Sequence, residues 1–275
     1  MKAIVLDIDG TLLTSDKVMS ERTKEALMTA QKKGVKVILA SGRPTTGMLD
    51  LAEELELGTY GGLVVSYNGS KVIDCQSGQE IYNQALSIEE GKAVLEHMKQ
   101  FDVTVMIDKD DYMYVNDVFS CTLEFRGQPL NVVEYEARGG KYKLCEKDDL
   151  AAFLDYPINK ILTAGEANYL KTAHHDMMAP FKDKLNCVFT AEFYFEFTAK
   201  GIDKAKALET VLTPMGIEAK DVIAFGDGHN DATMLAYAGL GVAMGNAVPE
   251  LKELADTITK SNDEDGIVTI LTKYL

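Results

Sequence analysis

Short apolar runs alternate with longer amphipathic stretches along much of this 275-residue chain. Each run has the length of a strand buried on both faces and ends in turn-forming residues. We expect such strands at 3–6, 35–40, 63–66, 222–225 and 241–244. The stretch from Ser20 to Lys33 is long enough for a helix, with Gly34 as its stop. Strands that alternate with helices predict a parallel sheet with helical crossovers, which is an α/β fold.

The middle of the chain has a different pattern. Ser87 and Glu90 form a capping box that opens a helix. We expect strands at 103–107, 112–115, 158–163, 187–190 and 193–197, with helical and loop material between 116 and 155. The sequence therefore predicts a second α/β unit at 84–190, inserted into a core made of 1–83 and 191–275. The alternative is one continuous domain.

Charge and composition exclude several classes of partner. The net charge of −15 argues against a nucleic-acid partner, which would need a basic face. The longest apolar runs are far too short to cross a membrane, and Met1-Lys2 runs directly into the first strand, which leaves no room for a signal peptide. Four cysteines lie far apart without a Cys-x-x-Cys pair, which indicates reduced thiols: Cys75, Cys121, Cys145 and Cys187. We expect a cytoplasmic protein with no membrane partner.

Two carboxylates follow the first apolar run directly. In an extended chain, Asp7 and Asp9 point the same way because they are two residues apart. Two like charges held close repel each other unless a cation neutralises them. Carboxylate oxygens are the ligands that Mg²⁺ takes from proteins. The pair therefore favours a magnesium site, with a solvated strand exit or a fragment of a calcium loop as alternatives.

Other polar residues recur just after strands or at helix starts. They are Ser41 and Gly42, Lys204, and the group Asp227, Asn230 and Asp231. The carboxyl ends of parallel strands lie along one edge of the sheet, where open α/β sheets bind ligands. A hydroxyl, an ammonium, an amide and several carboxylates are the groups needed to hold a phosphoryl group and its metal. Taken singly, each residue has an ordinary alternative, as a helix cap, a surface charge or a turn residue.

These motifs carry a resemblance to a known family. The segment Asp7-Ile8-Asp9-Gly10-Thr11-Leu12 resembles the first motif of the haloacid dehalogenase-like (HAD) superfamily. Ser41, Lys204 and the segment 226–231 match its second, third and fourth motifs in the family order. The whole pattern is similar to the Cof-type phosphatases. The resemblance implies a Rossmann-like parallel-sheet core with an inserted α/β cap domain that covers the active site.

The resemblance also implies roles for single residues. It makes Asp7 the nucleophile that forms an aspartyl-phosphate, and Asp9 the general acid and base. It assigns phosphate contacts to Ile8 through its backbone, Ser41, Gly42, Lys204 and Asn230. It assigns the metal site, for Mg²⁺, to Asp7, Asp9, Asp227 and Asp231. The chain departs from many relatives at Ala205, where glycine is common, and at His229.

The sequence thus predicts a Mg²⁺-dependent phosphatase that hydrolyses a small phosphorylated metabolite, such as a sugar phosphate. Two alternatives stay open at this point. A phosphomutase would return the phosphoryl group to its substrate, and a non-catalytic sensor would bind a metabolite in the same pocket. We expect loops of the inserted unit to contact the leaving group and to set the preference among substrates.

Overall fold

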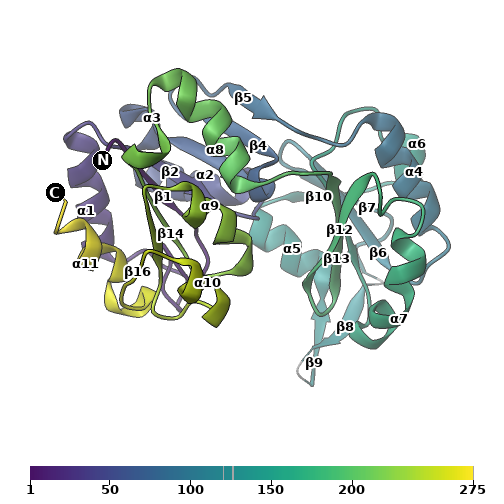
Figure 1. Ribbon diagram of the computed structural model, residues 1–275. Helices are drawn as coiled ribbons and strands as arrows, with labels where there is room; N and C mark the ends of the chain where they lie inside the picture. Colours follow the sequence, from purple (N-terminus) through teal and green to yellow (C-terminus); the bar gives the residue numbers. More distant parts are fainter. Residues whose placement is uncertain (120, 126, 275) are drawn as a thin grey trace. The chain divides into compact units, whose positions relative to one another are not determined.

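The computed structural model describes residues 1–119, 121–125 and 127–274, and these form two compact units (Figure 1). The core unit consists of Met1–Asn83 and Asp203–Leu275, and the inserted unit of Gln84–Ile202. The second boundary differs from the expected one after residue 190. The reason is that Tyr194–Ala199 (β13) forms an antiparallel strand pair with Leu185–Ala191 (β12) and lies in the sheet of the inserted unit.

The core unit is built on a sheet with the strand order β16-β15-β14-β1-β2-β3-β4-β5. Its strands are β1 Ala3–Leu6, β2 Lys36–Ala40, β3 Leu63–Ser66, β4 Lys71–Asp74, β5 Glu80–Asn83, β14 Val222–Gly226, β15 Leu240–Ala243 and β16 Thr257–Ile258. The strands from β16 to β3 are parallel, and β4 and β5 add an antiparallel hairpin at one edge. The predicted parallel-sheet α/β core is confirmed.

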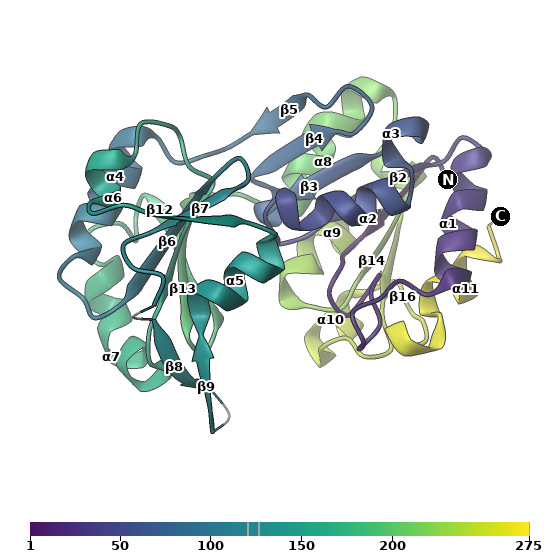
Figure 2. The ribbon, with the colours of Figure 1, turned by 180° about the vertical axis from the view of Figure 1, so that it is seen from behind.

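Helices cover both faces of this sheet. They are α1 Glu21–Lys32, α2 Leu49–Glu54, α3 Leu57–Tyr60, α8 Lys204–Leu212, α9 Ala232–Tyr237, α10 Pro249–Leu254 and α11 Gly266–Leu271. Figure 1 shows α8 and α9 in front of the sheet, and Figure 2, seen from behind, shows α2 in front. Because both faces are covered, the central strands need apolar side chains on both sides, which explains their continuous hydrophobic runs.

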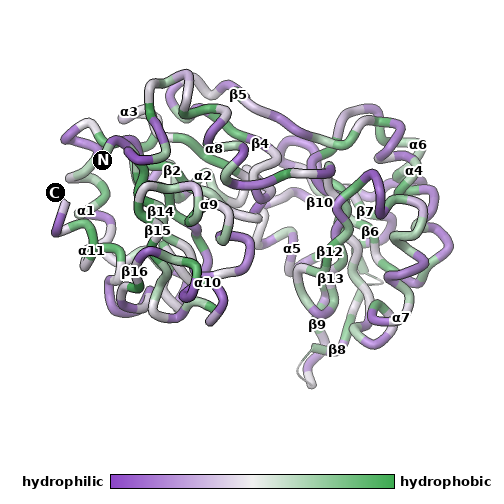
Figure 3. The backbone as a smooth tube through the Cα atoms, viewed as in Figure 1, coloured by the Kyte–Doolittle hydropathy of each residue, from purple (hydrophilic) through white to green (hydrophobic). Residues whose placement is uncertain are grey.

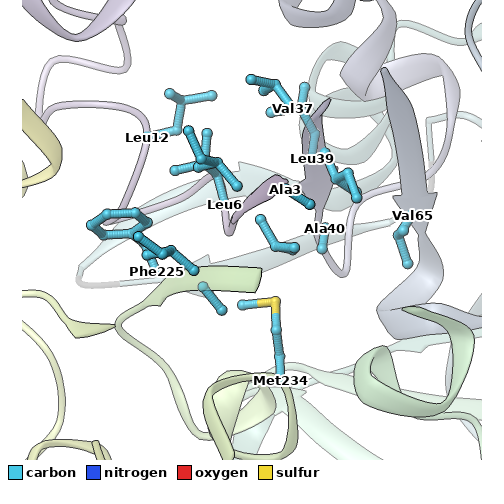
Figure 4. Packing of buried hydrophobic residues seen from close by; sticks show 14 of the residues in the cluster. Ala3, Leu6, Leu12, Val37, Leu39, Ala40, Val65, Phe225 and Met234 are labelled. Atoms are coloured by element: carbon cyan, nitrogen blue, oxygen red, sulfur yellow. The ribbon is translucent and has the colours of Figure 1, made fainter. Parts of the chain in front are cut away.

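The core packs around the central strands. All residues of β1 are fully buried, and Figure 4 shows Leu6, Leu39 and Phe225 close together with Met234 of α9 nearby. Figure 3 shows the same central strands in the green of hydrophobic residues. This packing fixes the strand ends, so the polar residues that follow them are held by a rigid scaffold.

The inserted unit has its own sheet, with the order β10-β7-β6-β11-β13-β12, and a separate two-stranded hairpin, β8-β9. Its elements are α4 Ile88–Met98, β6 Thr104–Lys109, β7 Tyr112–Val115, β8 Thr122–Phe125, β9 Gln128–Asn131, α5 Val132–Gly140, β10 Lys143–Glu146, α6 Leu150–Phe153, β11 Lys160–Ala164, α7 Ala167–Met178, β12 and β13. The helical and loop material expected at 116–155 is therefore wrong in part, since β8, β9 and β10 lie there. These short strands carry weak alternation: β8 and β9 pair with each other as a hairpin, and β10 pairs with the more distant β7.

Two further expectations concern the whole described chain. The four cysteines are free thiols, as predicted: Cys75, Cys121, Cys145 and Cys187. Within the described residues, no helix combines the length and the hydropathy that a membrane crossing requires.

Candidate active site

The predicted motif residues meet at one edge of the core sheet. β1 pairs in parallel with both β2 and β14, so the loops that follow these three strands are neighbours. Asp7 follows β1, Ser41 follows β2, and Asp227 follows β14. The fourth contribution comes from α8, whose first residue is Lys204. Helix α8 is capped by Asp203, which accepts a hydrogen bond from the Lys206 amide.

Lys204 is the centre of a buried ion cluster. Its side chain is fully buried, and its Nζ donates to Asp7 Oδ1 at 2.8 Å and to Asp231 Oδ1 at 2.6 Å. It also donates to the carbonyl oxygen of Ala40 at 2.8 Å. Burial lowers the Lys204 pKa, but the charges of Asp7 and Asp231 outweigh burial and leave the pKa above its ordinary value. The ammonium is therefore charged, and all three of its protons are used.

Three carboxylates surround this single lysine. One ligand oxygen from each of Asp7, Asp227 and Asp231 lies within 4.8 Å of the others. Burial, together with the charge of Asp231, raises the pKa of Asp7 to about 7, although Lys204 opposes the rise. Burial also raises the pKa of Asp227 to about 6, although the Thr11 hydroxyl opposes it. Three carboxylates share the single charge of Lys204, and their oxygen atoms are the donors that a hard divalent cation prefers.

The loop after β14 is organised by Asp231. Its Oδ2 accepts hydrogen bonds from the amides of Asp227 and Gly228, each at 3.0 Å, while Oδ1 accepts from Lys204. This carboxylate is fully buried and already accepts three hydrogen bonds. Asp231 therefore positions both Lys204 and the backbone that carries Asp227. Thr11 fixes the Asp227 side chain by donating to its Oδ1 at 2.8 Å.

Glycine is required at position 10 for two reasons. Its φ of +83° lies in the left-handed region that side chains disfavour. A Cβ at this position would also lie 2.3 Å from Oδ2 of Asp227, much closer than real contacts allow. The turn after β1 therefore passes directly over the Asp227 carboxylate, and Asn246 holds it there by donating to the Gly10 carbonyl oxygen at 2.7 Å.

Asp9 has different partners from Asp7. Its Oδ2 accepts from Arg43 Nε at 2.7 Å, and its Oδ1 accepts from Arg43 Nη2 at 2.7 Å and from Lys17 Nζ at 2.9 Å. Burial raises the Asp9 pKa, but the hydrogen bonds from Arg43 and Lys17 outweigh it and leave the pKa below its ordinary value. The carboxylates of Asp7, Asp227 and Asp231 thus lie together. The Asp9 carboxylate instead contacts the guanidinium of Arg43 and the ammonium of Lys17.

The predicted phosphate contacts lie around the same edge. Ser41 is buried, and its Oγ accepts from the Arg43 amide at 3.2 Å. A Cβ on Gly42 would lie 3.0 Å from the side-chain amide of Asn68. The exposed Asn230 donates to Asn68 Oδ1 at 3.0 Å. The Ile8 carbonyl accepts from the Leu13 amide at 3.0 Å. The Ile8 amide is the backbone donor of this residue and so the group that could meet an anion.

The site therefore combines the buried Asp7 carboxylate, the neighbouring ammonium of Lys204, a group of three carboxylates that could hold a cation, and small polar donors. Such a set can hold a phosphoryl group and attack it with Asp7. A model of the haloacid dehalogenase-like hydrolases matches residues 4–271, which is nearly the whole chain. The chain belongs to this family.

Individual relatives of this hydrolase support the same assignment. A Bacillus subtilis phosphatase named for 5-amino-6-(5-phospho-D-ribitylamino)uracil is 30% identical, with 100% of this chain and 96% of that protein covered. The crystal structure of a haloacid dehalogenase-like hydrolase from Bacteroides thetaiotaomicron has a TM-score of 0.91 at 34% identity, covering 100% and 99% of the two chains. A sugar phosphatase of HAD subclass IIB has a TM-score of 0.78 at 25% identity, covering 100% and 99%. The prediction of a Cof-type phosphatase is confirmed.

Sequence reasoning missed several residues of this hydrolase that contact the motif side chains. Arg43 and Lys17 hold Asp9, Thr11 holds Asp227, and Asn68 contacts Asn230. Arg43 had a signal, because it directly follows Ser41-Gly42 in the loop after a buried strand. Asn68 had a weaker signal as part of a Tyr-Asn-Gly turn after the next strand. Nothing local marks Lys17, which reaches Asp9 from the exposed turn near residue 17.

Proposed function

We propose that this hydrolase is a Mg²⁺-dependent phosphatase that acts on a small phosphorylated metabolite through an aspartyl-phosphate intermediate. The observation that carries the proposal is the buried Asp7 carboxylate, which lies 2.8 Å from Lys204 and within a three-carboxylate group. A nucleophile, a fixed positive charge and a cation site are the parts that phosphoryl transfer requires.

In the first step, an Asp7 oxygen attacks phosphorus, and the bond between phosphorus and the leaving oxygen breaks. The protonated form of Asp9 gives its proton to the leaving oxygen, so the alcohol departs neutral. The contacts of Asp9 with Arg43 and Lys17 favour its ionised form, which is the form that takes up a proton in the second step. In the second step, water attacks the phosphorus of the aspartyl-phosphate, and Asp9 takes the water proton. The bond between Asp7 and phosphorus then breaks, which releases inorganic phosphate and restores both carboxyl groups.

The remaining residues bind and orient the phosphoryl group. Lys204 supplies a fixed charge beside the oxygen that attacks, and Ser41 and the Gly42 backbone supply donors at the end of β2. Asn230 supplies an amide from the loop after β14. Precisely placed donors of this kind account for much of the rate enhancement in phosphoryl transfer, because little other covalent work is needed.

The metal is assigned to the carboxylates of Asp7 and Asp227, with Asp231 as their support. Their oxygen donors match a hard divalent cation better than a soft one. When bound, Mg²⁺ would neutralise the charge that the carboxylates and the phosphoryl oxygens bring together.

The substrate is proposed to be a phosphorylated sugar or polyol. The names of two relatives support this class, since one acts on a phosphorylated ribityl compound and another is a sugar phosphatase. The core motifs address only the phosphoryl group and the metal, so we assign recognition of the leaving group to the inserted unit. Free thiols and substrates of this class are typical of the cytoplasm, which we propose as the site of action.

The experiment measures phosphate release from a panel of sugar and polyol phosphates with Mg²⁺, for the native protein and for Asp7→Asn. Asp7→Asn keeps the shape but removes the attacking charge, so turnover and labelling of the protein by phosphate should both disappear. Asp16→Asn is the matched control, because Asp16 is exposed in the loop after the same strand. Wild-type turnover by Asp7→Asn would refute the covalent route.

Two outcomes of the same assay distinguish the alternatives. A phosphomutase would convert its substrate into an isomeric phosphate without net phosphate release. A sensor would bind a panel member but release no phosphate from any of them, p-nitrophenyl phosphate included. We expect net phosphate release, lost on treatment with EDTA and restored by Mg²⁺.

A further inference from the structure

The contact between Arg43 and Asp9 is a two-pronged hydrogen bond. Nε and Nη2 of Arg43 meet the two carboxylate oxygens of Asp9, each at 2.7 Å. Two parallel bonds fix the plane of a carboxylate as well as its distance, which a single bond does not. The carboxylate of Asp9 is therefore held in one orientation.

Arg43 is itself anchored in the loop after β2. Its Nη1 donates to the Gly47 carbonyl oxygen at 3.2 Å, and its amide donates to Ser41 Oγ. Its carbonyl oxygen accepts from the Tyr67 amide at 2.9 Å. The guanidinium therefore connects Asp9, at the end of β1, to the loop that carries Ser41.

Lys17 is a weaker holder of the same carboxylate. Its side chain is 64% exposed against 26% for Arg43, and it makes one contact from a turn. An exposed single-point ion pair contributes little, because water and salt screen it and because a long side chain must be ordered. The other contacts found for the Asp9 carboxylate in the described residues all come from Arg43, so the orientation of Asp9 depends on Arg43.

We propose that Arg43 is the positioning residue for Asp9, and that it holds the carboxyl group where it can pass a proton to the leaving oxygen and take one from water. The proposal rests on the phosphatase function proposed above. Both bonds from Arg43 form to the ionised carboxylate, which is the form of Asp9 that takes the proton from water. The neutral carboxyl group keeps its carbonyl oxygen as an acceptor for one of them. A misplacement of about 1 Å in such a group can cost on the order of 100-fold in rate.

The test compares Arg43→Met with the native protein on phenyl phosphate and p-nitrophenyl phosphate. Phenolate is the more basic leaving group and needs the proton from Asp9, whereas p-nitrophenolate needs it much less. We expect kcat/KM to fall about 100-fold on phenyl phosphate and less than about tenfold on p-nitrophenyl phosphate. An equal loss on both substrates would overturn the proposal.

A double-mutant cycle tests whether Arg43 acts through Asp9. In an Asp9→Asn background, Arg43→Met should change kcat/KM on phenyl phosphate by less than about threefold, because the group that it positions is already gone. An undiminished effect in that background would assign Arg43 an independent role and reject the inference. Arg43→Lys keeps the charge without the fork, so it should also lose activity on phenyl phosphate, and native activity in this variant would count against the proposal.

Two controls separate this result from other failures. Arg22→Met makes the same change at an exposed arginine that pairs with Asp265, and it should leave kcat/KM within about twofold of native. Thermal melts check folding, and Arg43→Lys carries the cycle if Arg43→Met does not fold. If the native protein released no phosphate from any substrate, the proposed phosphatase function would be wrong. The comparisons of Arg43 variants with the native protein test the role of Arg43 alone.

Discussion

Replacement of Lys204 by methionine should destabilise the core unit strongly. Methionine fills a similar volume, but it removes the ammonium that pairs with Asp7 and Asp231 at 2.8 and 2.6 Å. The Lys204 side chain is fully buried, and those of its partners are 8% and 1% exposed, so water cannot replace the lost contacts. Breaking a buried pair by removing one partner costs about 3–5 kcal/mol.

The Ala40 carbonyl loses its donor in the same variant, which adds about 1 kcal/mol. We therefore expect the free energy of unfolding of the core to fall by about 5 kcal/mol, and its melting temperature by on the order of 10 °C. The penalty should be largest at pH 8 with EDTA present, when Asp7 is ionised and no metal compensates. It should shrink at pH 5, because Asp7 has a raised pKa and takes up a proton there.

The assay is hydrogen exchange as a function of denaturant, read on peptides from β1 and β14. These peptides report the core unit separately, which matters because a global melt of a two-unit chain need not be two-state. Lys206→Met is the matched control, since Lys206 is exposed on the same helix, and it should change stability by less than about 0.5 kcal/mol. A loss below about 1 kcal/mol at pH 8 for Lys204→Met would refute the buried ion cluster.

Three further predictions address the same edge of the sheet. Gly10→Ala should destabilise the core by about 2 kcal/mol more than Gly34→Ala. Both glycines have φ above +80°, but of the two only Gly10 would bring its added Cβ against another group, the Asp227 carboxylate. Equal losses of stability in denaturant unfolding would contradict this. Asp227→Asn should raise the Mg²⁺ concentration for half-maximal activity at least about tenfold. If a metal titration gave the same Mg²⁺ concentration for this variant and the native protein, Asp227 would not be a metal ligand. Without metal, the folded core holds protons on Asp7 and Asp227, with pKa values of about 7 and 6, that the unfolded chain has lost. Its stability should therefore fall as pH rises from about 5 to 8; melts in EDTA should show this slope, and Asp7→Asn should flatten it.

The sequence alone determined the architecture of the core and the position of its motif residues. Local patterns are sufficient for this, because a short apolar run between turn residues has few alternatives to a buried strand. Once the sheet is parallel, its topology brings the residues that follow the strands to one edge. Asp7, Ser41, Lys204 and Asp227 could therefore be assigned to one site without coordinates.

Only the tertiary structure decided which of these groups pair. Lys204 contacts Asp7, which lies 197 positions away in the chain. Asp9 pairs with Arg43 and does not belong to the group of Asp7, Asp227 and Asp231. Such pairings depend on side-chain direction and distance at the sheet edge, which no local pattern encodes. The same holds for β13, which looks like any buried strand in sequence. Its place in the inserted unit is set by its hydrogen bonds to β11 and β12, because a strand belongs to the sheet that satisfies its backbone.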